Sequence, residues 1–251
     1  MHKIKRHHDS FNSTFCESRG SMIKKHDHKL MGRSTQMGWL DSHFHFSFAK
    51  YFNLDNVNFG VLRVINDDMV APGHGFGMHP HQDMEIISYV INGHLTHGDN
   101  MGNRETITRG HIQYMSAGTG IVHSEVNEGE DVLRFLQIWI MPNQAGYAPN
   151  YGDYKYHWHD RLNKWLPLIN GEAPAKLHQD VKIYATFLEA GNTLDFPVKE
   201  GRQAYLVQIE GTSTVNNETL VDRDALSSVE ESLVLKAVKD SHYLILEMAK
   251  A

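Results

Sequence analysis

The amino-acid sequence predicts an all-β protein built from two antiparallel β-barrel or jelly-roll units in one chain, with few short helices. Three observations predict this class. Apolar residues come in short runs rich in Val, Ile, Tyr and Phe, and Gly, Asn and Asp separate the runs, as in antiparallel sandwiches and barrels. No amphipathic helix of three turns is visible between residues 44 and 139. The third observation is a weak internal repeat, described below.

The first 21 residues differ from the rest in composition. They carry four Lys or Arg residues against two acidic ones and contain no continuous apolar stretch, which argues against a secretory signal. We expect residues 1–21 to be a disordered or dispensable extension, with Met22 as an alternative start. An organelle transit peptide is the other interpretation of such a basic segment.

Residues 22–145 form the first predicted unit. Its apolar runs include FGVLRVIND at 59–67, MEIISYVING at 84–93 and LRFLQIWIMP at 133–142. Turn signals such as Asn92-Gly93 and Gly98-Asp99-Asn100 separate the runs, because Gly and Asn tolerate the positive φ angles of tight hairpins. The pattern predicts consecutive antiparallel strands.

Residues 146–175 interrupt this rhythm. The region is polar and aromatic, contains Pro149 and Pro167, and follows Pro142, so we interpret it as a linker between two β units. One short helix is expected near 161–166.

Residues 176–251 form the second predicted unit. The run AYLVQIEGTSTVNN resembles IISYVINGHLTHGD in the first unit, with Gly211 and Gly93 at the same place in each run. Each run is an apolar strand, a glycine turn and a strand that contains Thr. This weak repeat predicts two copies of one β fold.

Composition limits the function. The chain has 251 residues, a net charge of −6 and a single cysteine, Cys16. The negative charge argues against a protein that binds nucleic acid directly. A lone cysteine cannot form an internal disulfide. No apolar run is long enough to cross a bilayer. We therefore expect a soluble, cytoplasmic protein without a membrane partner, and a monomer, because nothing suggests an obligate interface.

Two short motifs carry the candidate chemistry: His79-Pro80-His81 and His123-Ser124-Glu125. Residues i and i+2 of a strand point to the same face, so each motif can aim two ligands into one barrel. Three imidazoles and a carboxylate suit a first-row divalent metal and leave positions open for water or substrate. The alternative is that these pairs are ordinary polar strand faces, which a single such motif would favour.

The chain resembles the cupin superfamily at these residues. The first cupin motif is matched by Gly73, His79, His81, Glu85 and Gly93. The second motif is matched by Gly110, Gly118, His123 and Asn127. Ser116 stands where the second motif usually has proline, and the last gap of the first motif is one residue longer than usual.

These departures are typical of one subfamily, and the sequence resembles the pirin family of two-cupin proteins. The resemblance rests on GWLDSHFHFSFA (38–49), LRVINDD (62–68), GFGMHPHQDMEI (75–86), MSAGTGIVHSE (115–125) and LQIWIMP (136–142). It implies one divalent metal on His79, His81, His123 and Glu125, which we expect to be Fe(II), with Cu, Zn, Ni, Co and Mn as alternatives. It also implies that Glu85, a ligand in many other cupins, is not a ligand here but hydrogen-bonds nearby.

The second unit lacks this site in the sequence. The histidine pair precedes Gly93 by 14 and 12 residues, and the same offsets from Gly211 fall on Pro197 and Lys199, which cannot replace a histidine pair. We therefore expect the C-terminal cupin to be metal-free and structural, as the resemblance to pirins also implies.

The resemblance extends to an activity, because bacterial pirin-like proteins are similar to quercetin 2,3-dioxygenases. These enzymes open the central ring of flavonols with O2 and release carbon monoxide. The implied partners are a flavonol such as quercetin and O2, with Glu125 as the catalytic base for the substrate hydroxyl. The alternatives are a non-enzymatic metal-binding regulator that acts through protein partners, and a cupin enzyme with another substrate.

Overall fold

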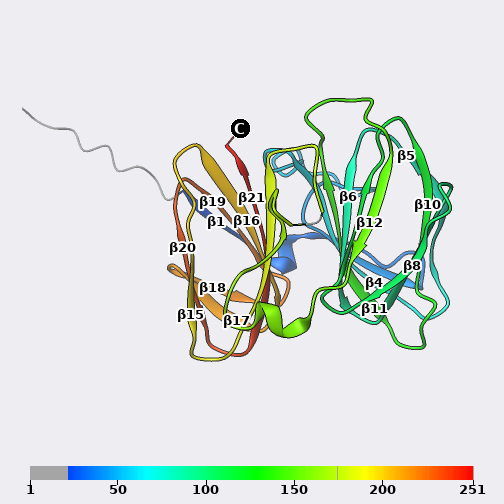
Figure 1. The fold of residues 1–251 in the computed structure, drawn as a ribbon. Helices are drawn as coiled ribbons and strands as arrows, with labels where there is room; N and C mark the ends of the chain where they lie inside the picture. Colours follow the sequence, from blue (N-terminus) through cyan, green and yellow to red (C-terminus); the bar gives the residue numbers. More distant parts are fainter. Residues whose placement is uncertain (1–21, 174, 251) are drawn as a thin grey trace, which may run out of the picture.

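The computed structural model describes residues 22–173 and 175–250, and the predicted extension at 1–21 lies outside the described residues. Figure 1 shows two β sandwiches side by side, each made of one large and one small antiparallel sheet. The all-β fold with two cupin units is confirmed. Among the described residues each unit is an open sandwich of two sheets, and none of the four sheets closes into a barrel.

The first sandwich pairs a seven-stranded sheet, in the order β12-β9-β6-β11-β4-β3-β2, with a four-stranded sheet, in the order β5-β10-β7-β8. Its strands are β2 (Gly32–Ser34), β3 (Leu40–Phe44), β4 (Leu62–Val70), β5 (Gly75–His81), β6 (Glu85–Asn92), β7 (His94–Asp99), β8 (Arg104–Thr108), β9 (Ile112–Ser116), β10 (Ile121–Val126), β11 (Leu133–Ile140) and β12 (Asn150–Tyr154).

The second sandwich repeats the design with a six-stranded sheet, in the order β1-β19-β16-β21-β14-β13, and a four-stranded sheet, in the order β15-β20-β17-β18. Its strands are β1 (Ile23–His26), β13 (Leu166–Ile169), β14 (Val181–Leu188), β15 (Thr193–Phe196), β16 (Arg202–Glu210), β17 (Thr212–Val215), β18 (Glu218–Val221), β19 (Ala225–Val229), β20 (Leu233–Ala237) and β21 (Ser241–Ala249).

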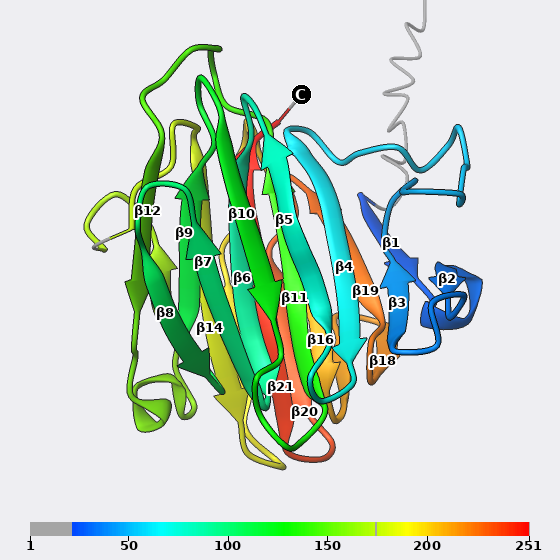
Figure 2. The same cartoon turned by 90° about the vertical axis from the view of Figure 1, so that its right-hand side faces the viewer.

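The two large sheets pack against each other at the centre of the molecule. One apolar cluster joins β4, β6, β9 and β11 of the first sandwich to β14, β16, β19 and β21 of the second, and the small sheets lie outside (Figures 1 and 2). Central strands are therefore buried on both faces, which explains their continuous apolar runs. β6 is buried along seven of its eight residues, whereas β20 alternates between buried and exposed residues.

Buried polar contacts also connect the two halves. The Tyr89 hydroxyl of β6 lies 2.6 Å from His242 Nε2 of β21. Asp67 of β4 is buried between Arg134 of β11 and Arg223 of the second half, with nitrogen–oxygen distances of 2.6 and 3.0 Å. Burial of this carboxylate is offset by the two guanidinium groups, which hold its pKa below the usual value.

The internal repeat is confirmed at its glycines. Gly93 and Gly211 have φ angles of 79° and 96°, a region that favours glycine. A Cβ atom at Gly93 would lie 2.9 Å from the backbone of Leu133, and one at Gly211 would lie 2.2 Å from the Asp240 carbonyl oxygen. The strand before each glycine also has a register shift at the same place, so the two units can be compared residue by residue.

The chain crosses between the sandwiches more than once. β1 pairs with β19 of the second sandwich, β12 pairs with β9 of the first, and β13 pairs with β14 of the second. The predicted division into segments 22–145, 146–175 and 176–251 stays a prediction. The pairing of β1 with β19 is relevant to it, because β1 belongs to the first predicted segment but lies in the second sandwich.

Helical structure is limited to two 3-10 turns, η1 (His28–Leu30) and η2 (Trp158–Arg161), within the described ranges. The position predicted for the short helix, near 161–166, was wrong: the helical turn η2 ends at Arg161, and Leu166 pairs with Ala185 in a sheet. The described part of the chain contains no helix long and apolar enough to span a membrane.

Candidate metal centre

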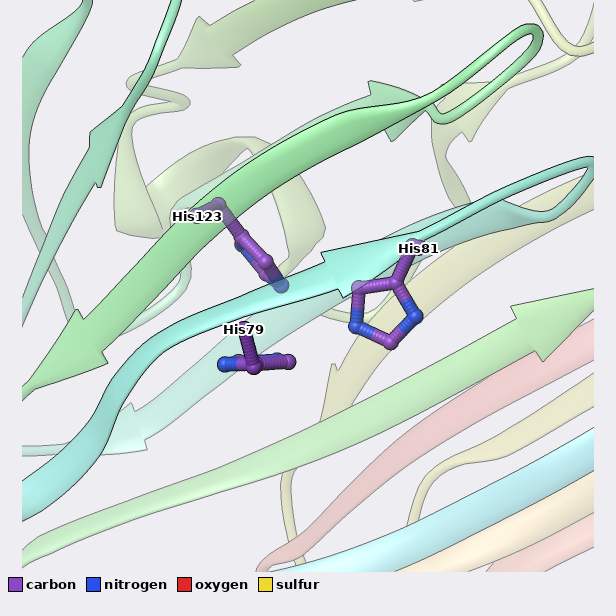
Figure 3. Close-up of side chains that lie close together, drawn as sticks. All are labelled: His79, His81 and His123. Atoms are coloured by element: carbon purple, nitrogen blue, oxygen red, sulfur yellow. The ribbon is translucent and has the colours of Figure 1, made fainter.

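Three predicted ligands meet in the first sandwich. His79 and His81 lie on β5, His123 lies on β10, and His79 and His123 are direct partners across these antiparallel strands. The candidate ligand nitrogens of the three rings lie within 4.8 Å of one another, and Figure 3 shows the rings gathered around one point. Nitrogen ligands bind first-row ions at roughly 2.0–2.1 Å, so one ion fits among them.

The hydrogen bonds of the rings leave nitrogens free for a metal. His79 Nδ1 donates to the Gly77 carbonyl oxygen at 2.7 Å, which fixes the tautomer that presents Nε2 as an acceptor. His123 is 1% exposed, and neither of its ring nitrogens has a hydrogen-bond partner among the described residues. A buried, unpaired imidazole is costly, and a metal ion would supply the missing partner.

The electrostatics of the site favour neutral imidazoles. Burial, together with the neighbouring histidines, lowers the pKa of His81 to about 4 and that of His123 to about 3. Metal ligation requires the neutral ring. These two histidines are therefore ready to bind a cation at neutral pH without first losing a proton.

Glu125 lies beside the three histidines rather than among them. It is 2% exposed and follows a register shift in β10 after His123. Its Oε1 accepts a hydrogen bond from Ser88 Oγ at 2.5 Å and another from Gln113 Nε2, and its Oε2 accepts one from Gln137 Nε2. The carboxylate lines the same cavity as His79 and His81, and its role as a ligand and base stays a prediction.

The groups that hold Glu125 belong to a polar row that the sequence analysis missed. The polar row is defined as Gln113, Ser88, Gln137 and Asn66, which are direct partners across β9, β6, β11 and β4. Ser88, Gln113 and Gln137 each lie between apolar neighbours, whereas Asn66 is followed by Asp67 and Asp68. For Ser88, Gln113 and Gln137, the available signal was a single polar residue in the middle of an apolar strand, because such groups are expensive to bury without a partner.

His79 and His81 line a cavity of about 330 Å3 between the two sheets, a volume in the range of small-molecule sites. Aromatic side chains form much of its wall, and Trp139 packs edge-on against His81 with ring centroids 4.9 Å apart. The lining residues include Phe44, Phe48, Phe76, Trp139, Asn66, Asp68, Gln137 and Glu125.

Glu85, the ligand of many other cupins, contacts other partners. Its carboxylate accepts hydrogen bonds from Ser116 Oγ at 2.7 Å and from the Tyr114 hydroxyl at 3.0 Å, and it lies 3.2 Å from His178 Nδ1. It is absent from the cavity wall. The hydrogen-bonding role expected for Glu85 agrees with these contacts.

The second sandwich has apolar residues at the four matching positions. Glu125 pairs with His97, which lies four residues after Gly93. Leu235 pairs with Val215, which lies four residues after Gly211. The strand pairings then match His123 to Leu233 and His79 to Phe196. Val198, two residues after Phe196, matches His81. All four side chains are buried in one apolar cluster.

The predicted counterparts Pro197 and Lys199 were wrong by one residue. His81 precedes Gly93 by 12 residues, whereas Val198 precedes Gly211 by 13. The connection before the central strand is therefore one residue longer in the second unit. The expectation that this unit lacks a histidine pair holds at the corrected positions.

Comparison with known families gives two matches. The family model described as Pirin matches residues 25–140. The model described as Quercetinase C-terminal cupin domain matches residues 169–248. The two matches fall on the two sandwiches.

Individual relatives match over nearly the whole chain. A "putative quercetin 2,3-dioxygenase" of Zymomonas mobilis is 42% identical over 89% of this chain and 97% of its own length. The quercetin 2,3-dioxygenase of Escherichia coli K12 is 37% identical over 84% of this chain and 92% of its own. A crystal structure of the Escherichia coli pirin YhhW with nickel(II) superposes with a TM-score of 0.85 at 34% identity, covering 92% of this chain and all of the other.

Proposed function

The chain belongs to the pirin family, and from that premise we propose that it is a metal-dependent quercetin 2,3-dioxygenase, which cleaves a flavonol with O2 and releases carbon monoxide. Relatives that carry this name support the proposal. The observation that carries it is local: the imidazoles of His79, His81 and His123 cluster within metal-ligating distance of one another in the first sandwich, and His79 and His81 line an aromatic-walled cavity.

The donor set fits one divalent ion, with His79, His81 and His123 as ligands and Glu125 as the fourth. The related crystal structure of a bacterial pirin in complex with nickel(II) supports the binding of a divalent ion by this family. Nitrogen-rich sites of this kind accept several first-row ions, and we propose Fe(II) for this protein. When bound, the ion would lower the pKa of a substrate hydroxyl that contacts it.

Glu125 is the residue of this chain that would receive that proton. It lies in the water-poor interior of the sandwich and lines the cavity. Ser88, Gln113 and Gln137 orient its carboxylate from the large sheet. A base held by several donors keeps a fixed position relative to its substrate. Phe44, Phe48 and Phe76 would pack on a flat ring system beside it.

The test is turnover by protein purified without oxygen and loaded with Fe(II). We expect quercetin and O2 to be consumed in equal amounts with one carbon monoxide released per turnover. The variant His123→Ala should lose its metal and at least a hundredfold in rate. His159→Ala is the matched control, because its side chain is 72% exposed and lies outside the cavity.

Two results would contradict the proposal. Stoichiometric metal without turnover of any flavonol would favour a regulatory or different enzymatic role. Turnover that survives His123→Ala unchanged would place the chemistry at another site.

A further inference from the structure

Two buried polar residues in the cavity wall have no part in the chemistry proposed above. Asp68 and Asn66 lie on β4 of the large sheet, across the cavity from the small sheet that carries the histidines. Their exposed fractions are 2% and 4%. Neither side chain forms an ion pair with a described residue, unlike Asp67 between them, which faces Arg134 and Arg223.

Their hydrogen bonds are incomplete. The Ser42 hydroxyl donates to Asp68 Oδ1, which occupies one of the two carboxyl oxygens. Asn66 Oδ1 is fully buried and has no hydrogen-bond partner among the described residues. A buried acceptor left without a partner costs about 1–3 kcal/mol. Because the two residues line the cavity, a ligand in the cavity can supply the missing partners.

The chemical character of the pair indicates the kind of ligand. Burial, with the nearby Asp67, Glu125 and Asp41, raises the pKa of the Asp68 carboxyl to about 7. At neutral pH this carboxyl therefore exists partly in its protonated form, which both donates and accepts hydrogen bonds. The Asn66 amide does the same. A phenolic hydroxyl, which also donates and accepts, is complementary to this pair.

We propose that Asp68 and Asn66 form a second polar subsite that binds a peripheral hydroxyl of an aromatic substrate and thereby selects polyhydroxylated flavonols. The inference rests on the proposed function and refines its substrate class. The Phe side chains of the cavity wall can pack against any flat ring, so they cannot distinguish flavonols by the number or position of their hydroxyl groups. A buried pair that hydrogen-bonds a hydroxyl rejects an analogue without it, because its groups are then left unpaired.

The experiment compares quercetin with 3-hydroxyflavone, which keeps the hydroxyl expected at the metal and lacks the peripheral ones. We expect the wild type to favour quercetin in kcat/KM, and both Asp68→Ala and Asn66→Leu to reduce the ratio of the two kcat/KM values by about tenfold or more. Asp68→Asn keeps a hydrogen-bonding group of the same shape and should retain part of the preference. Asp195→Asn is the matched control, because Asp195 is exposed on β15 of the second sandwich.

A binding measurement separates this inference from the proposed function. Equilibrium dialysis of the metal-free protein gives the ratio of the two dissociation constants without turnover. Failure of the wild type to turn over either flavonol overturns the proposed function, and the dialysis ratio still decides the subsite. Equal binding of both flavonols by the wild type, or a ratio unchanged in Asp68→Ala and Asn66→Leu, overturns the subsite. A ratio that falls in both variants supports it.

Discussion

The two sandwiches share the order of their central strands but have different interiors. In the first, the polar row Gln113, Ser88, Gln137 and Asn66 crosses the large sheet. The same four positions of the second sandwich, found through Gly93 and Gly211, are Leu226, Leu206, Ile245 and Tyr184. The fold therefore requires neither set, and we infer that the polar row serves the candidate metal site.

The two interiors also differ in how much continuous apolar packing they contain. The second sandwich is filled by one continuous cluster of 13 buried apolar residues. The first has two separate clusters, of six and four residues, with the polar row, the candidate ligands and the cavity in the same interior. Apolar burial is the main source of stability, so we infer that the second sandwich acts as a scaffold. The shared cluster between the large sheets supports the first sandwich from behind.

The largest expected effect comes from placing the site's carboxylate in the scaffold. Leu235 is fully buried and matches Glu125, but no polar row faces it. We expect Leu235→Glu to lower the free energy of unfolding by roughly 3–5 kcal/mol, or to prevent folding, because the carboxylate would be buried without donors. Urea denaturation monitored by circular dichroism measures the change.

The neighbouring residue provides the control for this substitution. Val234 is 46% exposed on the same strand, so Val234→Glu should change the free energy of unfolding by less than about 0.5 kcal/mol. Equal stability of the two variants would mean that the second interior tolerates charge, and the comparison between the sandwiches would fail.

The sequence allowed much of this comparison to be predicted, because periodicity and turn residues act locally. The strand class, the repeat at Gly93 and Gly211 and the three clustered histidines follow from such patterns. The polar row does not, since its members come from four strands that are not consecutive in the chain and align only through sheet register. The pairing of β1 with β19 also lacks a local signal, because about 200 residues separate the partners.

A smaller effect concerns pH in the metal-free protein. An unfolded Asp titrates at about 3.9, whereas burial beside Asp67, Glu125 and Asp41 raises the pKa of native Asp68 to about 7. Between these values the native state keeps a proton that the unfolded state has released. Asp68 therefore makes the protein less stable as pH rises from 4 to 7.

The variant Asp68→Asn removes this titration. We expect its free energy of unfolding, relative to wild type, to increase by about 1–3 kcal/mol between pH 4.5 and pH 8. Urea denaturation at both pH values measures the change, and Asp195→Asn serves as an exposed control. Parallel pH profiles for Asp68→Asn and wild type would show that Asp68 is ionised in the native state.

The most direct test of the central claim is the anomalous diffraction of a crystal of the metal-loaded protein. We predict one ion per chain, bonded at about 2.1 Å to nitrogens of His79, His81 and His123, with the Glu125 carboxylate as the fourth ligand. An ion in the second sandwich, or one bound without these histidines, would contradict it.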